Sequence, residues 1–132
     1  VFLMESILTL KLKQGIQEHQ KGNLKEAEIL YRNVLHVEPN HPDANHNFVL
    51  LTAKLGEPAM GVQFLRTAIE TNPTIADYWV SIIKTLIEVD DVENAKIALE
   101  KAKEVGHNSE VFEKLESNIE LLRSSRTESE AV

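Results

Sequence analysis

A period of 34 residues runs through the chain and constrains its fold more than any other feature. Shifting the sequence by 34 positions superposes Gly22–Pro39 on Gly56–Pro73, and then on Asp90–His107. Each of these segments starts at a turn residue and continues with apolar residues at helical spacing, and the first two end in proline. Repetition at this period is typical of stacked pairs of helices, because one pair alone cannot bury its apolar face.

The apolar spacing and the positions of glycine and proline predict seven helices. We expect Asn23, Thr74 and Asp91 to cap the helices that follow them, because short polar side chains accept hydrogen bonds from the first free backbone N–H groups. The last helix has one apolar face (Phe112, Leu115, Ile119, Leu122), which suits a terminal helix that covers the last repeat. The predicted helices lie at about residues 5–21, 24–37, 42–55, 58–72, 75–89, 92–105 and 109–123.

The chain length of 132 residues suits one domain, and no internal linker or low-complexity run divides it. We therefore predict a single domain over residues 1–123. Within it we place repeats at about 8–41, 42–75 and 76–109, followed by a capping helix at about 109–123. The remaining residues, 124–132, are polar and are predicted to be disordered. The chain starts at Val1, which leaves open whether Met4 is the natural start or the chain is a fragment.

Composition excludes several classes of function. The chain has no cysteine, so disulfides and thiol catalysis are ruled out. Its net charge of -7 disfavours nucleic acid and anionic membranes as partners, and no apolar run approaches the roughly 18 residues of a membrane span. No glycine-rich phosphate loop or Gly-x-Ser-x-Gly motif is present, and many carboxylates stand at helix starts, where the helix dipole favours them. We predict a non-enzymatic, cytoplasmic protein without a cofactor.

The histidines do not have the spacing of a metal site. His36, His41 and His46 recur within a short stretch, but His41 and His46 are five residues apart and lie on either side of the helix start at Pro42. Zinc ligands on one helix are commonly four residues apart. We therefore interpret His41 as a loop histidine beside a helix start and predict no metal site.

The repeated residues resemble the tetratricopeptide repeat (TPR) family over residues 8–109. Two residues depart from the family pattern. His107 replaces a third closing proline, and Asn45 occupies the position that Trp79 occupies one repeat later. The resemblance implies an all-α, right-handed αα-superhelix of three helix–turn–helix repeats with a C-terminal capping helix. The matching landmarks are the small residues Gly15, Ala27, Gly61, Ala68, Ala95 and Ala102, the aromatic residues Tyr31 and Trp79, and the closing Pro39 and Pro73.

The same resemblance implies where a partner binds. In this family the first helices of successive repeats line a concave groove that accepts extended peptides or helices. The corresponding positions here are Leu12, Ile16, His19, His46, Asn47, Leu50, Lys54, Val80, Lys84 and Ile87. A second orientation of the first helix stays open, because Gln14 and Glu18 stand where the family packs apolar residues. In that orientation Leu12 and Ile16 belong to the core, and the groove is polar.

Some TPR domains hold a C-terminal carboxylate with a clamp of lysine, arginine and asparagine. At the matching positions this chain has Leu12, Ile16, Asn47, Asp77 and Ser81. Only Asn47 fits such a clamp, and Asp77 would repel a carboxylate. The resemblance therefore predicts a protein or peptide partner but not an acidic chain terminus.

Two further roles stay open from the sequence. The run EAEILYRNVLHVEPNHPDA is similar to TPR segments of bacterial sulfotransferase and glycosyltransferase fusion proteins. That similarity implies a bacterial segment that presents a partner or substrate to a larger transferase. Self-association is the other alternative, because TPR arrays often form homo-oligomers through an end helix or the groove.

Overall fold

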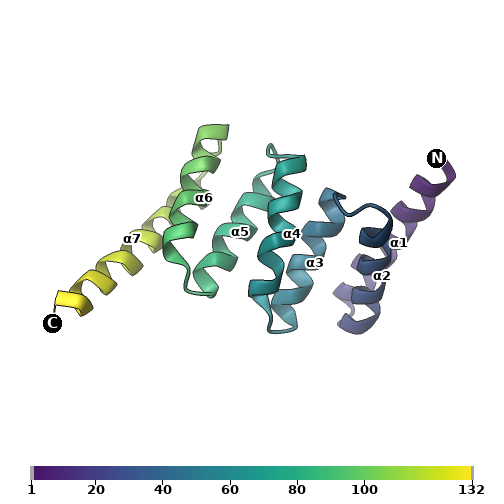
Figure 1. Cartoon of the computed structure of the whole chain (residues 1–132), viewed down its shortest axis with the longest axis horizontal. Helices are drawn as coiled ribbons and strands as arrows, with labels where there is room; N and C mark the ends of the chain where they lie inside the picture. The colour runs from purple at the N-terminus through teal and green to yellow at the C-terminus, as the bar shows by residue number, and fades with distance from the viewer. Residues whose placement is uncertain (1, 132) are drawn as a thin grey trace. The chain divides into compact units, whose positions relative to one another are not determined.

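The computed structural model describes the backbone of residues 2–131 and the side chains of residues 3–129. Seven α-helices follow one another in this part of the chain, without a strand among them, as the sequence predicts (Figure 1). They are α1 (Phe2–Gln20), α2 (Leu24–Val37), α3 (Pro42–Lys54), α4 (Pro58–Thr71), α5 (Ala76–Glu88), α6 (Val92–Val105) and α7 (Glu110–Ala131).

The chain divides into two compact units, which we call the N-terminal unit (α1–α4) and the C-terminal unit (α5–α7). The boundary lies between Asn72 and Pro73. The single domain over residues 1–123 stays a prediction. Each unit is described below by itself.

In the N-terminal unit α1 packs against α2, α3 packs against α4, and α2 and α3 join the two pairs. The small residues of the repeat allow this close packing. A Cβ atom on Gly15 would lie 2.6 Å from Cε1 of Tyr31, and a Cβ atom on Gly61 would lie 2.9 Å from Cγ1 of Val49. The core of the α1–α3 region consists of Leu8, Leu12, Ala27, Tyr31, Val34, Ala44, Phe48 and Leu51.

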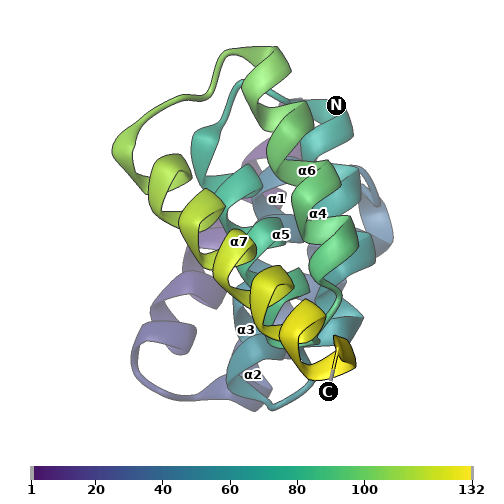
Figure 2. The ribbon, with the colours of Figure 1, turned by 90° about the vertical axis from the view of Figure 1, so that its left-hand side faces the viewer.

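In the C-terminal unit α5 pairs with α6, and α7 packs against both of them (Figure 2). One side of α7 is buried, as its apolar spacing predicts, and this side carries Phe112, Leu115 and Ile119. Leu122 was predicted on the same face, but it is 37% exposed. The buried side of α7 therefore ends near Ile119, and the helix continues beyond it.

The turns that precede α3 and α5 are held by equivalent positions with different side chains. Nδ2 of Asn45 donates hydrogen bonds to the carbonyl oxygens of Pro39 (3.0 Å) and His41 (2.8 Å). Thirty-four residues later, Nε1 of Trp79 donates to the carbonyl oxygen of Pro73 at 2.7 Å. Asparagine in the tryptophan position therefore preserves an N–H donor to the corresponding proline carbonyl of its own repeat.

His107, which replaces the third closing proline, takes part in the same arrangement. Its Nε2 donates to the carbonyl oxygen of Pro73 at 3.0 Å, and its ring stacks on Phe112 with the ring centres 5.5 Å apart. This residue therefore links the turn before α5 to the start of α7 within the C-terminal unit.

Two of the three predicted helix caps differ in the structure. Asp91 caps α6, because its carboxylate accepts a hydrogen bond from the Asn94 N–H. Asn23 stands at the start of α2 but makes no capping bond, since its amide instead donates to the carboxylate of Glu18 at 2.7 Å. The prediction for Thr74 is wrong, because α5 begins at Ala76 with the preceding residue in the cap position.

His41 provides a cap that the sequence did not predict. Its Nδ1 accepts a hydrogen bond from the Ala44 N–H at 3.2 Å, at the start of α3. This contact agrees with the interpretation of His41 as a histidine beside a helix start. Among the described residues, no three side chains that bind metals come together.

The end of α7 also differs from the prediction, which placed disorder at residues 124–132. The helix continues to Ala131, and residue 132 lies outside the described part. Nε of Arg123 lies 3.1 Å from Oε1 of Glu93, and Arg126 pairs with the carboxylate of Asp90. These contacts with residues 30 and 36 positions earlier hold the start of the extra turns against α6 and the turn that precedes it.

Candidate peptide-binding surfaces

The predicted groove residues of α1 face inward. Leu12 is 8% exposed and belongs to the core of the N-terminal unit, and Ile16 packs against that core. His19 is also buried. Of the two orientations that the sequence leaves open, the structure has the one in which α1 turns its apolar side inward. Leu12 and His19 are therefore core residues rather than groove residues.

His19 is a buried polar residue with a defined partner. Its Nδ1 lies 3.1 Å from the hydroxyl oxygen of Tyr31, and the two rings meet edge to face. Burial lowers the pKa of His19 from its ordinary value, and the nearby charge of Lys54 lowers it further. Burial also raises the pKa of Tyr31 to about 12. The pair stays neutral near pH 7 and holds the end of α1 against α2.

The predicted groove residues of α3 are accessible, and we call them the α3 surface (His46, Asn47, Leu50, Lys54). Leu50 is 40% exposed, Lys54 is exposed, and the other two are half-buried. Nδ2 of Asn47 donates to the backbone oxygen of Asp43 at 2.8 Å, which fixes the amide on the helix. The α3 surface thus offers an aliphatic side chain with a lysine one turn later.

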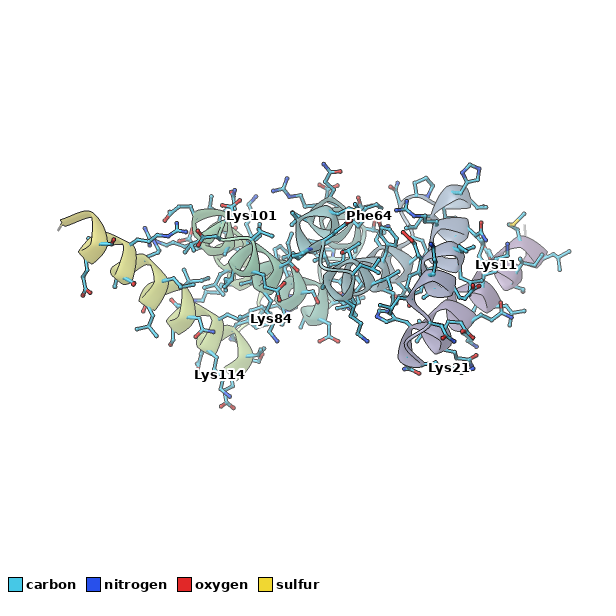
Figure 3. All side chains as sticks on the ribbon, turned by 90° about the horizontal axis from the view of Figure 1, so that it is seen from below. Lys11, Lys21, Phe64, Lys84, Lys101 and Lys114 are labelled. Atoms are coloured by element: carbon cyan, nitrogen blue, oxygen red, sulfur yellow. The ribbon has the colours of Figure 1, made fainter. Side chains whose placement is uncertain are left out.

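The predicted groove residues of α5 form a second set, the α5 surface (Val80, Lys84, Ile87). Lys84 is exposed, and Val80 and Ile87 are half-buried. Lys84 extends from α5 with its amino group away from the helix (Figure 3). This surface again combines aliphatic side chains with a lysine, and Asp77 is exposed one turn before Val80.

The ion pairs of the described residues join side chains that are at least partly exposed. The pKa shifts of His19 and Tyr31 belong to two buried side chains that contact each other and lie outside both surfaces. Within residues 2–131 no helix is both long enough and apolar enough to cross a bilayer.

Similarity to solved structures decides the fold. The first TPR domain of RPAP3 (Spaghetti), solved with an HSP90 peptide SRMEEVD, matches with a TM-score of 0.79 at 16% identity, over 89% of this chain and 93% of that one. The Sgt2 TPR domain of Aspergillus fumigatus matches with a TM-score of 0.79 at 16% identity, over 92% of this chain and 82% of that one. The chain has the tetratricopeptide-repeat fold. This result confirms the predicted all-α helical-repeat class.

The other matches agree with this fold. A TPR protein of Parabacteroides merdae matches with a TM-score of 0.81 at 22% identity, over 94% of this chain and 48% of that one. Human tetratricopeptide repeat protein 7A is 36% identical over 59 residues, which are 45% of this chain and 7% of that protein. No family model matches the sequence. These matches do not show the transferase resemblance, which stays a prediction.

Proposed function

We propose that this chain is a non-catalytic module that binds a short segment of another protein through the first helices of its repeats. The observation that carries the proposal is that α3 exposes Leu50 and α5 leaves Val80 and Ile87 half-buried, on each helix beside an exposed lysine, in a fold that binds a peptide in the RPAP3 domain. Exposed apolar side chains on a helical scaffold commonly mark an interaction site.

The proposed ligand is an internal segment with an apolar anchor rather than an acidic chain terminus. Leu12 and Ile16, which occupy two positions of the carboxylate clamp, face the core and cannot donate hydrogen bonds. Asp77 occupies a third position and is exposed, so its charge repels a terminal carboxylate. The HSP90 peptide SRMEEVD, which is bound in the RPAP3 structure, is therefore a suitable negative probe.

Selection from a random-peptide phage library on the purified chain, followed by calorimetry with the enriched peptides, tests the proposal. We expect Leu50→Asp to weaken binding at least about tenfold, because it places a charge at the apolar contact. Leu121→Asp on α7 is the matched control, since Leu121 is 69% exposed and lies on neither surface. Enriched peptides that bind Leu50→Asp and Lys84→Glu as well as the unchanged chain would overturn the proposal.

Two further measurements separate binding from folding. Ile16→Asp is expected to lower thermal stability because Ile16 packs against the core, whereas Leu50→Asp leaves the melting temperature nearly unchanged. The peptide SRMEEVD is expected to show no measurable binding. A micromolar dissociation constant for it would contradict the proposed ligand chemistry.

A further inference from the structure

His19 occupies a position where the other first helices of the repeat carry apolar residues. One and two repeats later the same position holds Ala53 of α3 and Ile87 of α5. The position of its partner Tyr31 is likewise filled by apolar residues in the later repeats, and these are the buried Leu65 and Leu99. The helix pair of a repeat therefore forms without a polar pair at these two positions, so the fold itself does not require the histidine and the tyrosine.

The end of α1 is closed by backbone hydrogen bonds that lie beside His19. The N–H groups of Lys21, Gly22 and Asn23 donate to the carbonyl oxygens four, three and five residues earlier, at 3.1, 3.1 and 2.9 Å. The equivalent three bonds close α3 at residues 55–57 and α5 at residues 89–91, with lengths between 2.8 and 3.1 Å. The three turns thus share one backbone arrangement, and the first of them has a titratable side chain where the others have Ala53 and Ile87.

The helices that α1 contacts, α2 and α3, each direct one titratable group at the His19 ring. Tyr31 of α2 places its hydroxyl oxygen 3.1 Å from Nδ1, and the ammonium group of Lys54 of α3 is near enough to repel a positive charge on the ring. On α1 itself, the neighbouring carboxylate of Glu18 is engaged by the turn residues Lys21 and Asn23. The ring is 7% exposed, so water reaches it poorly.

A proton on His19 would place a cation without a counter-charge in this contact. Tyr31 cannot become an anion to balance it near neutral pH, because burial raises the pKa of Tyr31 to about 12. A buried charge of this kind is costly unless it is paired or reaches water. The shortest route to water is local, since His19 lies in the last turn of α1 and helix ends open more readily than the middle of a helix.

We propose that His19 is an acid-sensitive switch: a proton on its ring detaches the last turn of α1 from α2 and α3 and lowers the affinity of the α3 surface for its ligand. The surface is affected because Lys54 belongs to it and Leu50 lies one turn before Lys54. A ligand that covers Lys54 also keeps water from the ring, so ligand and proton oppose each other. The effect on the ligand rests on the proposed function, whereas the detachment of the helix end does not.

Amide hydrogen exchange followed by NMR tests the switch in the chain without ligand. Protection factors correct for the direct effect of pH on exchange. We expect those of Lys21, Gly22 and Asn23 to fall at least about threefold between about pH 7 and about pH 5. The amides of residues 55–57 and 89–91 are internal controls, since the same bonds close those turns. An equal fall at all three turns, or no fall at the first, would overturn the proposal.

Two substitutions separate a switch from a purely structural contact. His19→Gln removes the titrating group, so the protection of the first turn should no longer depend on pH. Lys54→Gln changes an exposed side chain and removes the charge that repels the proton, so the turn should open at a higher pH than in the unchanged chain. Lys84→Gln is the matched control, because Lys84 is an exposed lysine of a first helix in the other unit. An opening pH that Lys54→Gln leaves unmoved would overturn the proposal.

Calorimetry at about pH 7 and about pH 5 with a peptide enriched in the phage selection tests the effect on the α3 surface. We expect the dissociation constant to rise at least about threefold toward acid pH in the unchanged chain but not in His19→Gln. His46→Gln removes the histidine of the surface itself and should keep the rise. A constant affinity, or a rise that His46→Gln abolishes, would overturn this effect.

The two experiments fail in different ways. A selection that enriches no peptide would overturn the proposed function and the effect on the ligand with it. The exchange measurement needs no ligand, so it still decides whether a proton on His19 detaches the end of α1.

Discussion

Helices α1 and α7 each bury one side in their own unit, but they differ on the opposite side. Helix α1 exposes the row Leu3, Ile7 and Leu10 there, with lysines on both flanks. Helix α7 exposes mainly acidic and small polar residues, among which Leu121 is an isolated aliphatic side chain. A polar outer side needs no cover in water, whereas an apolar outer side is stabilised by packing against other apolar surface.

The largest expected contrast lies between the two sides of each helix. Phe112→Ala should cost about 3–5 kcal/mol and Leu12→Ala about 2–5 kcal/mol of unfolding free energy, because each leaves a cavity in a packed core. Leu10→Ala and Leu121→Ala should each change it by less than about 0.5 kcal/mol, since both leucines are exposed. Urea unfolding measures the change in unfolding free energy for all four variants. A loss for Leu10→Ala equal to that for Leu12→Ala would show that the side of α1 that carries Leu10 is part of the core.

A smaller contrast between α1 and α7 concerns how the free energy of unfolding depends on pH. The buried side of α1 includes His19, whose pKa is lowered by burial and by Lys54, whereas the buried side of α7 carries only apolar residues. Above about pH 6.5 the histidine is neutral in both the folded and unfolded states. Below that pH the unfolded chain takes up the proton first, so this residue makes stability fall as the solution becomes more acidic.

The measurement is the difference in unfolding free energy between the unchanged chain and His19→Gln from about pH 8 to about pH 5. The contribution of His19 should decrease toward acid pH. The control Phe112→Leu keeps His19, so its difference from the unchanged chain should stay nearly constant. A contribution of His19 that grows toward acid pH would mean that the protonated form is favoured in the fold.

The smallest expected effect lies at the end of α7. Arg126→Ala should cost no more than about 1 kcal/mol, because the pair with Asp90 is exposed to solvent. Its effect should be local, with faster amide hydrogen exchange after Arg123 and no change near Phe112. Lys114→Ala removes an exposed pair within α7 and is the control. Unchanged exchange in Arg126→Ala would show that the extra turns do not depend on this contact.

The helices were predictable because the residues at their ends restrict the backbone conformation locally. Gly22, Gly56 and Gly106 adopt left-handed backbone angles after helices, and Pro42 and Pro58 begin the helices that follow. These residues restrict their own backbone whatever the distant parts of the chain do. The seven helices and their repeat therefore followed from the sequence, and the binding role of the α3 and α5 surfaces stays a prediction.

The orientation of α1 was not predictable in the same way. A helix with aliphatic residues on two opposite sides does not reveal from its spacing which side meets α2. In the structure the side with Leu8 and Leu12 shares a core with Tyr31 of α2, whose ring lies close to Gly15. The end of α7 depends on ion pairs with residues about 30 positions earlier. The missing cap at Asn23 reflects competition from Glu18 for the same side chain. All three outcomes depend on contacts between elements.

The turns before α3 and α5 have a consequence for how such a chain changes over generations. Asn45 and Trp79 share little except an N–H group that reaches a proline carbonyl. The turn needs a hydrogen-bond donor that reaches the proline carbonyl, and two unlike amino acids supply it. Tandem copies of an ancestral repeat can therefore diverge in sequence while each keeps the same turn.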